Sequence, residues 1–93
     1  MTDVVETKRL TSIAGDIKTV VIVTDSACAT GHTVDFNMDA ADAKGRVFQE
    51  ILGSSLQNAT GTTVASATWS NSTGILTMPS ISTGIHKLTV WGY

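Results

Sequence analysis

The chain has 93 residues, a length that fits one domain and leaves no room for a second. Charged residues make up 15% of it, the formal net charge is −2 and basic residues form no cluster, which excludes a nucleic-acid-binding stripe. No apolar run reaches the ~18 residues of a membrane-spanning helix, and the single cysteine, Cys28, excludes an intrachain disulfide. We therefore expect neither a nucleic-acid nor a membrane partner, and folding in a reduced cytoplasm.

Threonine, serine and asparagine replace much of the missing charge. Globular domains ordinarily carry about 25% charged residues. Hydroxyl-rich sequences suit strands and turns, and a surface with little charge repulsion tolerates close contact with neighbouring molecules. The composition therefore fits either a plain polar surface or one that packs against partners.

Residues 1–12 are polar and have no clear periodicity, with Val4, Val5 and Leu10 as their large apolar side chains. Such a segment is either an arm that a partner orders or a first edge strand. We place a polar N-terminal arm at residues 1–16 and a single β domain at residues 17–93.

The strongest strand signal is Ile17–Thr24, which is rich in β-branched residues. Both of its faces are apolar in the middle, which predicts a central strand covered on both sides. His32–Met38 alternates apolar and polar residues and is predicted to be a half-buried strand. These two strands are expected to form an antiparallel hairpin.

The segment Asp39–Leu56 admits two interpretations. In the favoured one, a loop through Asp39–Gly45 leads into a long strand with a glycine bend. In the other, Asp39 caps a short helix near residues 39–52. Glycines weaken a helix by about 1 kcal/mol each, which counts against the second interpretation because Gly45 and Gly53 fall in this segment.

The remainder of the chain has strand patterns to its end, at Thr63–Ser70, Gly74–Met78 and Gly84–Trp91. The sequence Asn71–Gly74 is typical of a tight turn. Thr-Gly occurs four times, each time before a strand candidate and at irregular spacing, which indicates short turns and not a solenoid repeat. We predict a mainly β fold, a small antiparallel β-sandwich or barrel-like domain.

Residues with catalytic or metal-binding chemistry form no recognisable motif. Cys28 and His32 lie four positions apart in a loop, and neither His32 nor His86 belongs to a metal-ligand spacing. Four aspartates are candidates for a Ca²⁺ site at one end of the sheet, or for ordinary loop and capping roles: Asp25, Asp35, Asp39 and Asp42. We expect no enzyme, no catalytic or metal-binding residue and no cofactor.

The aromatic residues fall into two groups. Phe36, Phe48 and Trp69 are predicted to lie in the core, whereas Trp91 and Tyr93 close the chain on the face opposite its last buried positions. Terminal aromatics of this kind cover a sheet edge, form a protein interface or stack on sugars. The candidate interface residues are Lys8, Arg9, Trp91 and Tyr93.

Several stretches together resemble a known class of protein. They are the β-branched strand Lys18–Val23, a Thr-Gly turn leading into Thr33–Phe36, a Trp strand bracketed by Thr-Gly, and the Gly-x-His-x-x-Thr-Val-x-Gly ending at residues 84–92. In order and composition, Ile17 to Tyr93 resembles the head decoration, or cement, proteins of tailed viruses. The resemblance implies a β-sandwich or barrel-like subunit, often a trimer, seated where major capsid subunits meet.

The expected function is therefore that of a structural virion protein, a capsid decoration subunit that stabilises the shell of a bacteriophage. The resemblance implies the major capsid protein as partner, a homo-oligomer with a homotrimer favoured, and a location in the virion after synthesis in the host cytoplasm. The alternative is a small carbohydrate- or protein-binding β module that uses Trp91 and Tyr93.

Overall fold

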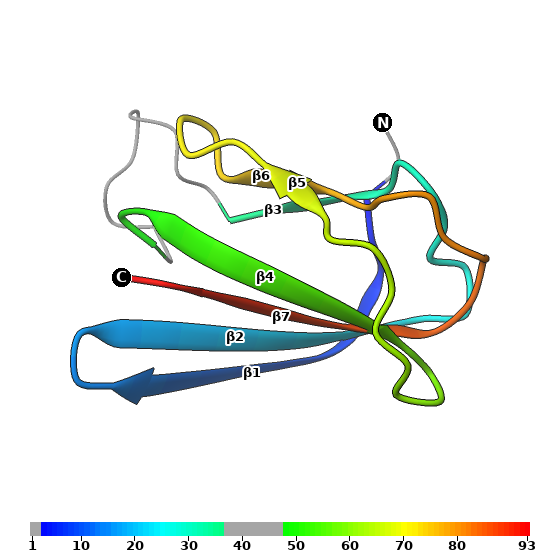
Figure 1. The fold of residues 1–93 in the computed structure, drawn as a ribbon, viewed down its shortest axis with the longest axis horizontal. Helices are drawn as coiled ribbons and strands as arrows, with labels where there is room; N and C mark the ends of the chain where they lie inside the picture. Colours follow the sequence, from blue (N-terminus) through cyan, green and yellow to red (C-terminus); the bar gives the residue numbers. More distant parts are fainter. Residues whose placement is uncertain (1–2, 37–47) are drawn as a thin grey trace.

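A computed structural model describes residues 3–36 and 48–93 of the chain. Within these residues, strands are the only regular elements, and they form two antiparallel sheets (Figure 1). The fold is thus mainly β, as predicted, with the two-layered arrangement of a small β-sandwich. The strands are β1 (Glu6–Ala14), β2 (Ile17–Thr24), β3 (Thr33–Asp35), β4 (Ile51–Asn58), β5 (Thr68–Trp69), β6 (Ile75–Thr77) and β7 (His86–Gly92).

The larger sheet has the strand order β1-β2-β7-β4, and the smaller has the order β3-β6-β5. The ends of the chain therefore meet in one sheet, since β7 inserts between β2 and β4. The smaller sheet packs against one face of the larger and closes the core (Figure 1). Large side chains on these two inner faces are almost fully buried, among them Val20, Ile22, Phe36, Phe48, Leu56, Leu76, Leu88 and Val90.

The predicted hairpin between Ile17–Thr24 and His32–Met38 is wrong. β2 pairs with β1 on one side and with β7 on the other, while β3 belongs to the smaller sheet and pairs with β6. The reason is the turn at Gly15 and Asp16, which joins β1 to β2 in a two-residue hairpin with φ of 63° at Gly15. Alternation within a strand indicates which residues share a face but does not identify the neighbouring strand.

The N-terminal segment is an edge strand for most of its described length. Residues 6–14, which we expected to belong to a polar arm, form β1, and every residue of β1 is exposed. Val4, two positions before β1, is buried, and its backbone N–H donates a hydrogen bond to the carbonyl of Thr33 at 2.8 Å. The chain thus starts against the smaller sheet and then crosses to the edge of the larger one.

The middle of the chain partly follows the favoured interpretation. β4 runs from Ile51 to Asn58 with a bulge between Ile51 and Gly53, at the position of the predicted glycine bend. Residues 48–52 are not helical. The rest of the helical alternative, residues 39–47, and the predicted loop at Asp39–Gly45 lie outside the described residues. Met38 likewise lies outside them.

Two of the predicted core aromatics contact one another. The rings of Phe36 and Phe48 meet edge to face, with centroids 5.5 Å apart and planes inclined by 72°. Trp69 is half-buried and packs at the border of the core. Its strand is shorter than the predicted Thr63–Ser70, because residues 62–64 lie instead along the edge of β4.

Candidate interaction surface

The larger sheet has a second face that no element of the described chain covers, and we call it the outer face. In β2 the buried positions Val20, Ile22 and Thr24 alternate with half-buried or exposed ones, and the strand registers extend this alternation to the neighbouring strands. The outer face consists of Lys8, Leu10, Ser12, Ala14, Ile17, Thr19, Val21, Val23, Gly53, Ser55, Gln57, Lys87, Thr89 and Trp91.

β2 is a central strand, as predicted, but the described residues cover it on one side only. Val21 and Val23 point to the outer face and remain half-buried within the chain. The neighbours of Val21 in the register are Leu10, which is 57% exposed, and Thr89. Val23 lies between Lys8 and Lys87. Ile17–Thr24 is thus apolar on both faces, as its sequence indicated. The described residues bury only the inner face, and they leave the outer face without a covering layer.

Trp91 lies across Gly53 on this face. The two residues are opposite each other in the register of β4 and β7, and a Cβ atom on Gly53 would overlap the Trp91 indole. Glycine in a strand marks a site of close approach, and an aromatic ring across it restores the missing packing. Trp91 is therefore half-buried in a fixed position at one end of the outer face.

The outer face has a charge opposite in sign to that of the whole chain. Lys8 and Lys87 flank Val23 in one cross-strand row, and none of the residues that make up the outer face is acidic. The chain as a whole carries −2. The carboxylates of Glu6 and Asp16 lie on the inner side of β1 and in the β1–β2 turn. The face is thus apolar and hydroxyl-rich at its centre and basic at one end.

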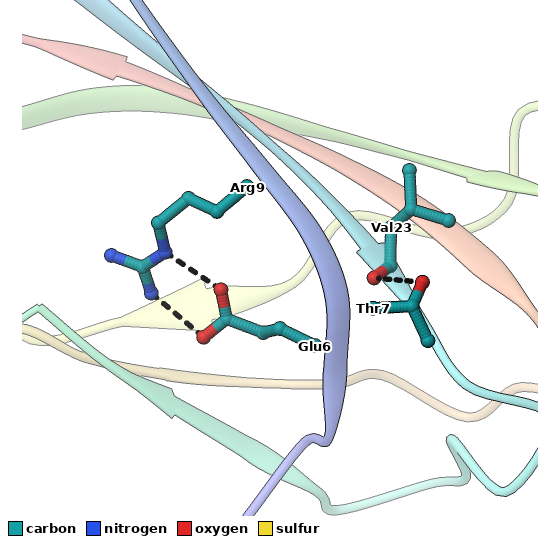
Figure 2. A network of polar contacts seen from close by, with 4 residues as sticks. All are labelled: Glu6, Thr7, Arg9 and Val23. Carbon is teal, nitrogen blue, oxygen red and sulfur yellow. Dashed lines mark hydrogen bonds and ion pairs between the residues drawn. The ribbon is translucent and has the colours of Figure 1, made fainter.

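Lys8 and Arg9, which the sequence analysis paired as interface candidates, point to opposite sides of β1. The bulge between Glu6 and Lys8 places Glu6 and Arg9 on the same, inner side. There the Glu6 carboxylate accepts hydrogen bonds from Nε and Nη2 of Arg9 at 2.6 and 2.8 Å (Figure 2). The Arg9 guanidinium also lies 5.4 Å from the centroid of the Phe36 ring. Arg9 therefore covers an open side of the core and does not belong to the outer face.

Tyr93, the fourth interface candidate, follows β7 and is 46% exposed. Its backbone is held beside the start of β4, where its N–H donates to the carbonyl of Glu50 at 3.1 Å and its carbonyl accepts from the N–H of Glu50 at 3.2 Å. The structure thus brings Lys8 and Trp91 onto one face, places Tyr93 just beyond the end of that face, and separates Arg9 from it.

Cys28 and the two histidines have local structural roles. Burial raises the pKa of the Cys28 thiol, a hydrogen bond with Thr24 opposes this shift, and the nearby charge of Asp25 adds to it. The thiol is therefore protonated and weakly nucleophilic near neutral pH. Nδ1 of His32 accepts a hydrogen bond from the backbone N–H of Ala29 at 3.3 Å. Neither geometry resembles a nucleophile beside its base.

His86 is buried at the other end of β7 from Trp91. Its backbone N–H donates to Oγ1 of Thr24 at 2.9 Å, and its Nδ1 lies 2.9 Å from the carbonyl oxygen of Gly84. A pocket of about 240 Å³ opens beside it, between the turn after β4 and the loop before β7. Its polar lining comes mainly from Asn58, Thr60, Ser82, Thr83 and His86.

The aspartates do not gather into a site within the described residues. Asp25 accepts a hydrogen bond from the backbone N–H of Ala27 at 3.0 Å, which is a turn-capping role. Across residues 3–36 and 48–93, no three His, Cys, Asp or Glu side chains lie close enough to hold a metal ion. Asp39 and Asp42 lie outside the described residues. The same residues contain no helix of the length and apolarity needed to span a membrane.

Comparison of the chain with protein-family models, curated proteins and solved structures finds no match. Four residues of the outer face were not among the candidates predicted from the sequence: Leu10, Val21, Gly53 and Lys87. The apolar second face of Ile17–Thr24 was a sequence signal for Val21, but it predicted burial within the chain. The other three became part of the surface only through the strand registers.

Proposed function

We propose that this protein is a non-enzymatic structural subunit that works by laying its outer face on another protein. The observation that carries this proposal is the outer face, which the described residues leave uncovered. It has half-buried Val21 at its centre, half-buried Val23 between the two lysines at one end, and Trp91 packed across Gly53 toward the other end. A strand apolar on both sides ordinarily lies between two layers, so a partner that covers this face would supply the second layer. Aromatic and aliphatic centres with a polar rim are typical of protein interfaces.

The charge of the outer face indicates the chemistry of the partner. Lys8 and Lys87 lie at one end and the face has no acidic residue, so an acidic rim on a flat partner surface would complement it. Two lysines are too few to track a nucleic-acid backbone, which needs several phosphate contacts. The partner we propose is therefore a folded protein.

Within this class, the finer proposal is a capsid decoration subunit bound to the outer surface of a major capsid protein. It is supported by the order and composition of Ile17–Tyr93, by the low charge of the chain and by the single broad docking face. A repeated shell makes a small contact sufficient, because a subunit that contacts its neighbours gains avidity over the lattice.

The experiment that tests the finer proposal has two steps. The genes beside the coding sequence are read first, and the proposal expects a major capsid, scaffold or maturation-protease gene among them. Particles assembled without the chain are then incubated with the purified protein and sedimented. Co-sedimentation that saturates at a fixed ratio to the major capsid protein supports decoration. A protein that stays in the supernatant at every concentration rejects it, whatever the gene neighbours are.

A second candidate function, a carbohydrate-binding module, is favoured by one observation. The Trp91 ring is held in place across Gly53, and exposed Tyr93 follows two positions later. Fixed aromatic rings stack on sugars at low entropic cost. A glycan array separates the two candidates: binding that Trp91→Ala abolishes without unfolding supports the module, and an array without signal removes it.

A further inference from the structure

The two edges of the larger sheet differ in how their backbone groups are satisfied. Along β4, the N–H of Ile51 donates to Oδ1 of Asn71 at 2.8 Å, and the carbonyl of Leu56 accepts from the N–H of Val64 at 2.9 Å. The opposite edge is β1, which in the described part of the chain pairs with β2 alone. Nine consecutive residues of β1 are exposed, so it offers the sheet's open edge.

β1 is protected against further pairing only near its start. Lys8, Arg9 and the bulge at Thr7 are devices that discourage a neighbouring strand. From Leu10 to Ala14 there is no charge, no proline and no bulge. This half also exposes Leu10 and Ile13, at 57% and 66%. A nine-residue strand with one protected half and one unprotected half is suited to a partner strand of defined direction.

The charges of β1 fit a second copy of the same strand in one direction only. In a parallel, in-register pair, Lys8 would face Lys8 and Arg9 would face Arg9, which is unfavourable. In an antiparallel pair centred on Thr11, Lys8 faces Ala14 and Arg9 faces Ile13 of the other copy. Every charge then lies opposite an uncharged side chain, and the regular stretch from Lys8 to Ala14 is used in full.

We propose that two copies of this protein associate by antiparallel pairing of β1 with β1 about a two-fold axis beside Thr11. An axis of this kind is perpendicular to the sheet and keeps each face on its own side, so the product is one eight-stranded sheet. Leu10 of each copy comes close to Leu10 of the other on the outer face. The pairing gives hydrogen-bond partners to the open backbone groups of β1 in both copies at once. It leaves no β1 edge to which a third copy could pair.

This inference goes beyond the proposed function, because it concerns contact between two copies and holds whatever partner the outer face binds. It nevertheless has a consequence for that function. Two outer faces joined in one plane form a bivalent surface, which binds a repeated partner more tightly than one face does. It also replaces the trimer expected from the resemblance with a closed dimer.

The first test is the mass of the full chain in solution as a function of concentration, by sedimentation equilibrium. We expect the wild type to form a dimer, and Thr11→Lys to shift the equilibrium to monomer because it places two lysines opposite each other at the axis. Thr11→Gln, which changes size without charge, keeps the dimer. So does Ser55→Lys, which adds the same charge near the other edge of the sheet. A wild type that stays monomeric up to its solubility limit overturns the proposal, as does a folded Thr11→Lys that dimerises like wild type.

The second test addresses the register. Residues paired across a two-fold axis have Cα atoms about 4.5–5.5 Å apart, within the range that a disulfide spans. Under mild oxidation, Thr11→Cys should form a disulfide-linked dimer. Ser55→Cys and the wild type, whose own Cys28 is buried, should not. Equal cross-linking of Thr11→Cys and Ser55→Cys would mean random collision and would overturn the pairing.

Discussion

The guanidinium of Arg9 and the carboxylate of Glu6 form two parallel hydrogen bonds although the residues are three apart on one strand. In a regular strand, positions separated by three point to opposite faces. The bulge at Thr7 reverses the alternation, and the Thr7 hydroxyl donates to the carbonyl of Val23 at 3.1 Å at the same place (Figure 2). The bulge thus places Arg9 on the inner side of β1, where it covers Phe36, and places Lys8 on the outer face.

Arg9→Ala should therefore destabilise the fold more than Glu6→Gln does. Each partner of the ion pair is about one-third exposed, so the pair itself contributes only about 0.5 kcal/mol. Arg9 additionally covers Phe36, and we expect a total loss of about 1 kcal/mol for Arg9→Ala. Urea midpoints give the comparison, with Lys8→Ala as the control of the opposite face. A loss for Lys8→Ala as large as that for Arg9→Ala would contradict the assignment.

Val21→Asp and Ile22→Asp are neighbouring substitutions with opposite expected outcomes. Ile22 has no exposed surface, so a carboxylate there should unfold the domain at a cost of several kcal/mol. Val21 points to the half-buried outer face, so Val21→Asp should leave the domain folded. Circular dichroism during thermal unfolding checks both. Unfolding by Val21→Asp alone would show that the two faces of β2 have been exchanged.

Gly53→Ala should destabilise the protein by about 1–3 kcal/mol, because its methyl group overlaps the Trp91 ring. Removing the ring removes the conflict, so the loss should be smaller when Trp91→Ala is already present. A double-mutant cycle of unfolding free energies measures this coupling. Strictly additive losses would show that the ring does not lie across Gly53.

Ser54→Ala should be neutral or stabilising, by up to about 1 kcal/mol. The Ser54 hydroxyl is buried on the inner side of β4, and it has no hydrogen-bond partner within the described structure. Replacing it removes an unsatisfied polar group and little volume. Ser55→Ala, one position along on the outer face, is the matched control and should change little. A clear loss for Ser54→Ala would indicate a partner for the hydroxyl.

Cys28 should contribute to the loss of stability at alkaline pH. Its thiol pKa is raised in the folded state, so the unfolded chain loses this proton first. The contribution is fully present below the pKa of an unfolded cysteine and is lost as the pH rises through the folded value. Between about pH 7 and 10, wild type should therefore lose more stability than Cys28→Ala does. Unfolding free energies measured against pH check this. If they fall in parallel for the two proteins, the pKa of Cys28 is not raised in the folded state.

Much of the fold follows from local patterns. The alternation in Gly84–Trp91 separated the buried residues Leu88 and Val90 from their neighbours, because side chains on a strand alternate strictly. Ile17–Thr24, which is apolar on both faces, was predicted to be covered on both sides, whereas the described residues cover only one. Which strand pairs with which was harder to predict. The Gly15-Asp16 turn was a readable hairpin signal, whereas the insertion of β7 between β2 and β4 depends on contacts far apart in sequence.

Those residues of the outer face that local sequence patterns mark were predictable, and the others were not. Trp91 was identified from its position at the end of an alternating strand, and Lys8 from its sequence neighbourhood. The separation of Lys8 from Arg9 was not predictable, because a bulge leaves no local sequence mark here. The apolar outer side of Val21 was visible in the sequence, but a pattern of burial does not say which molecule provides the cover.

Cover of the outer face by a partner protein is tested by co-sedimentation of Val21→Asp with particles assembled without the chain. We expect this variant to remain folded, because Val21 is not in the core, and no longer to sediment with particles that bind the wild type. Lys18→Asp, a new carboxylate on the inner side of the same strand, should bind as wild type does. A folded Val21→Asp that binds particles as tightly as wild type would show that the outer face is not the surface that binds the partner.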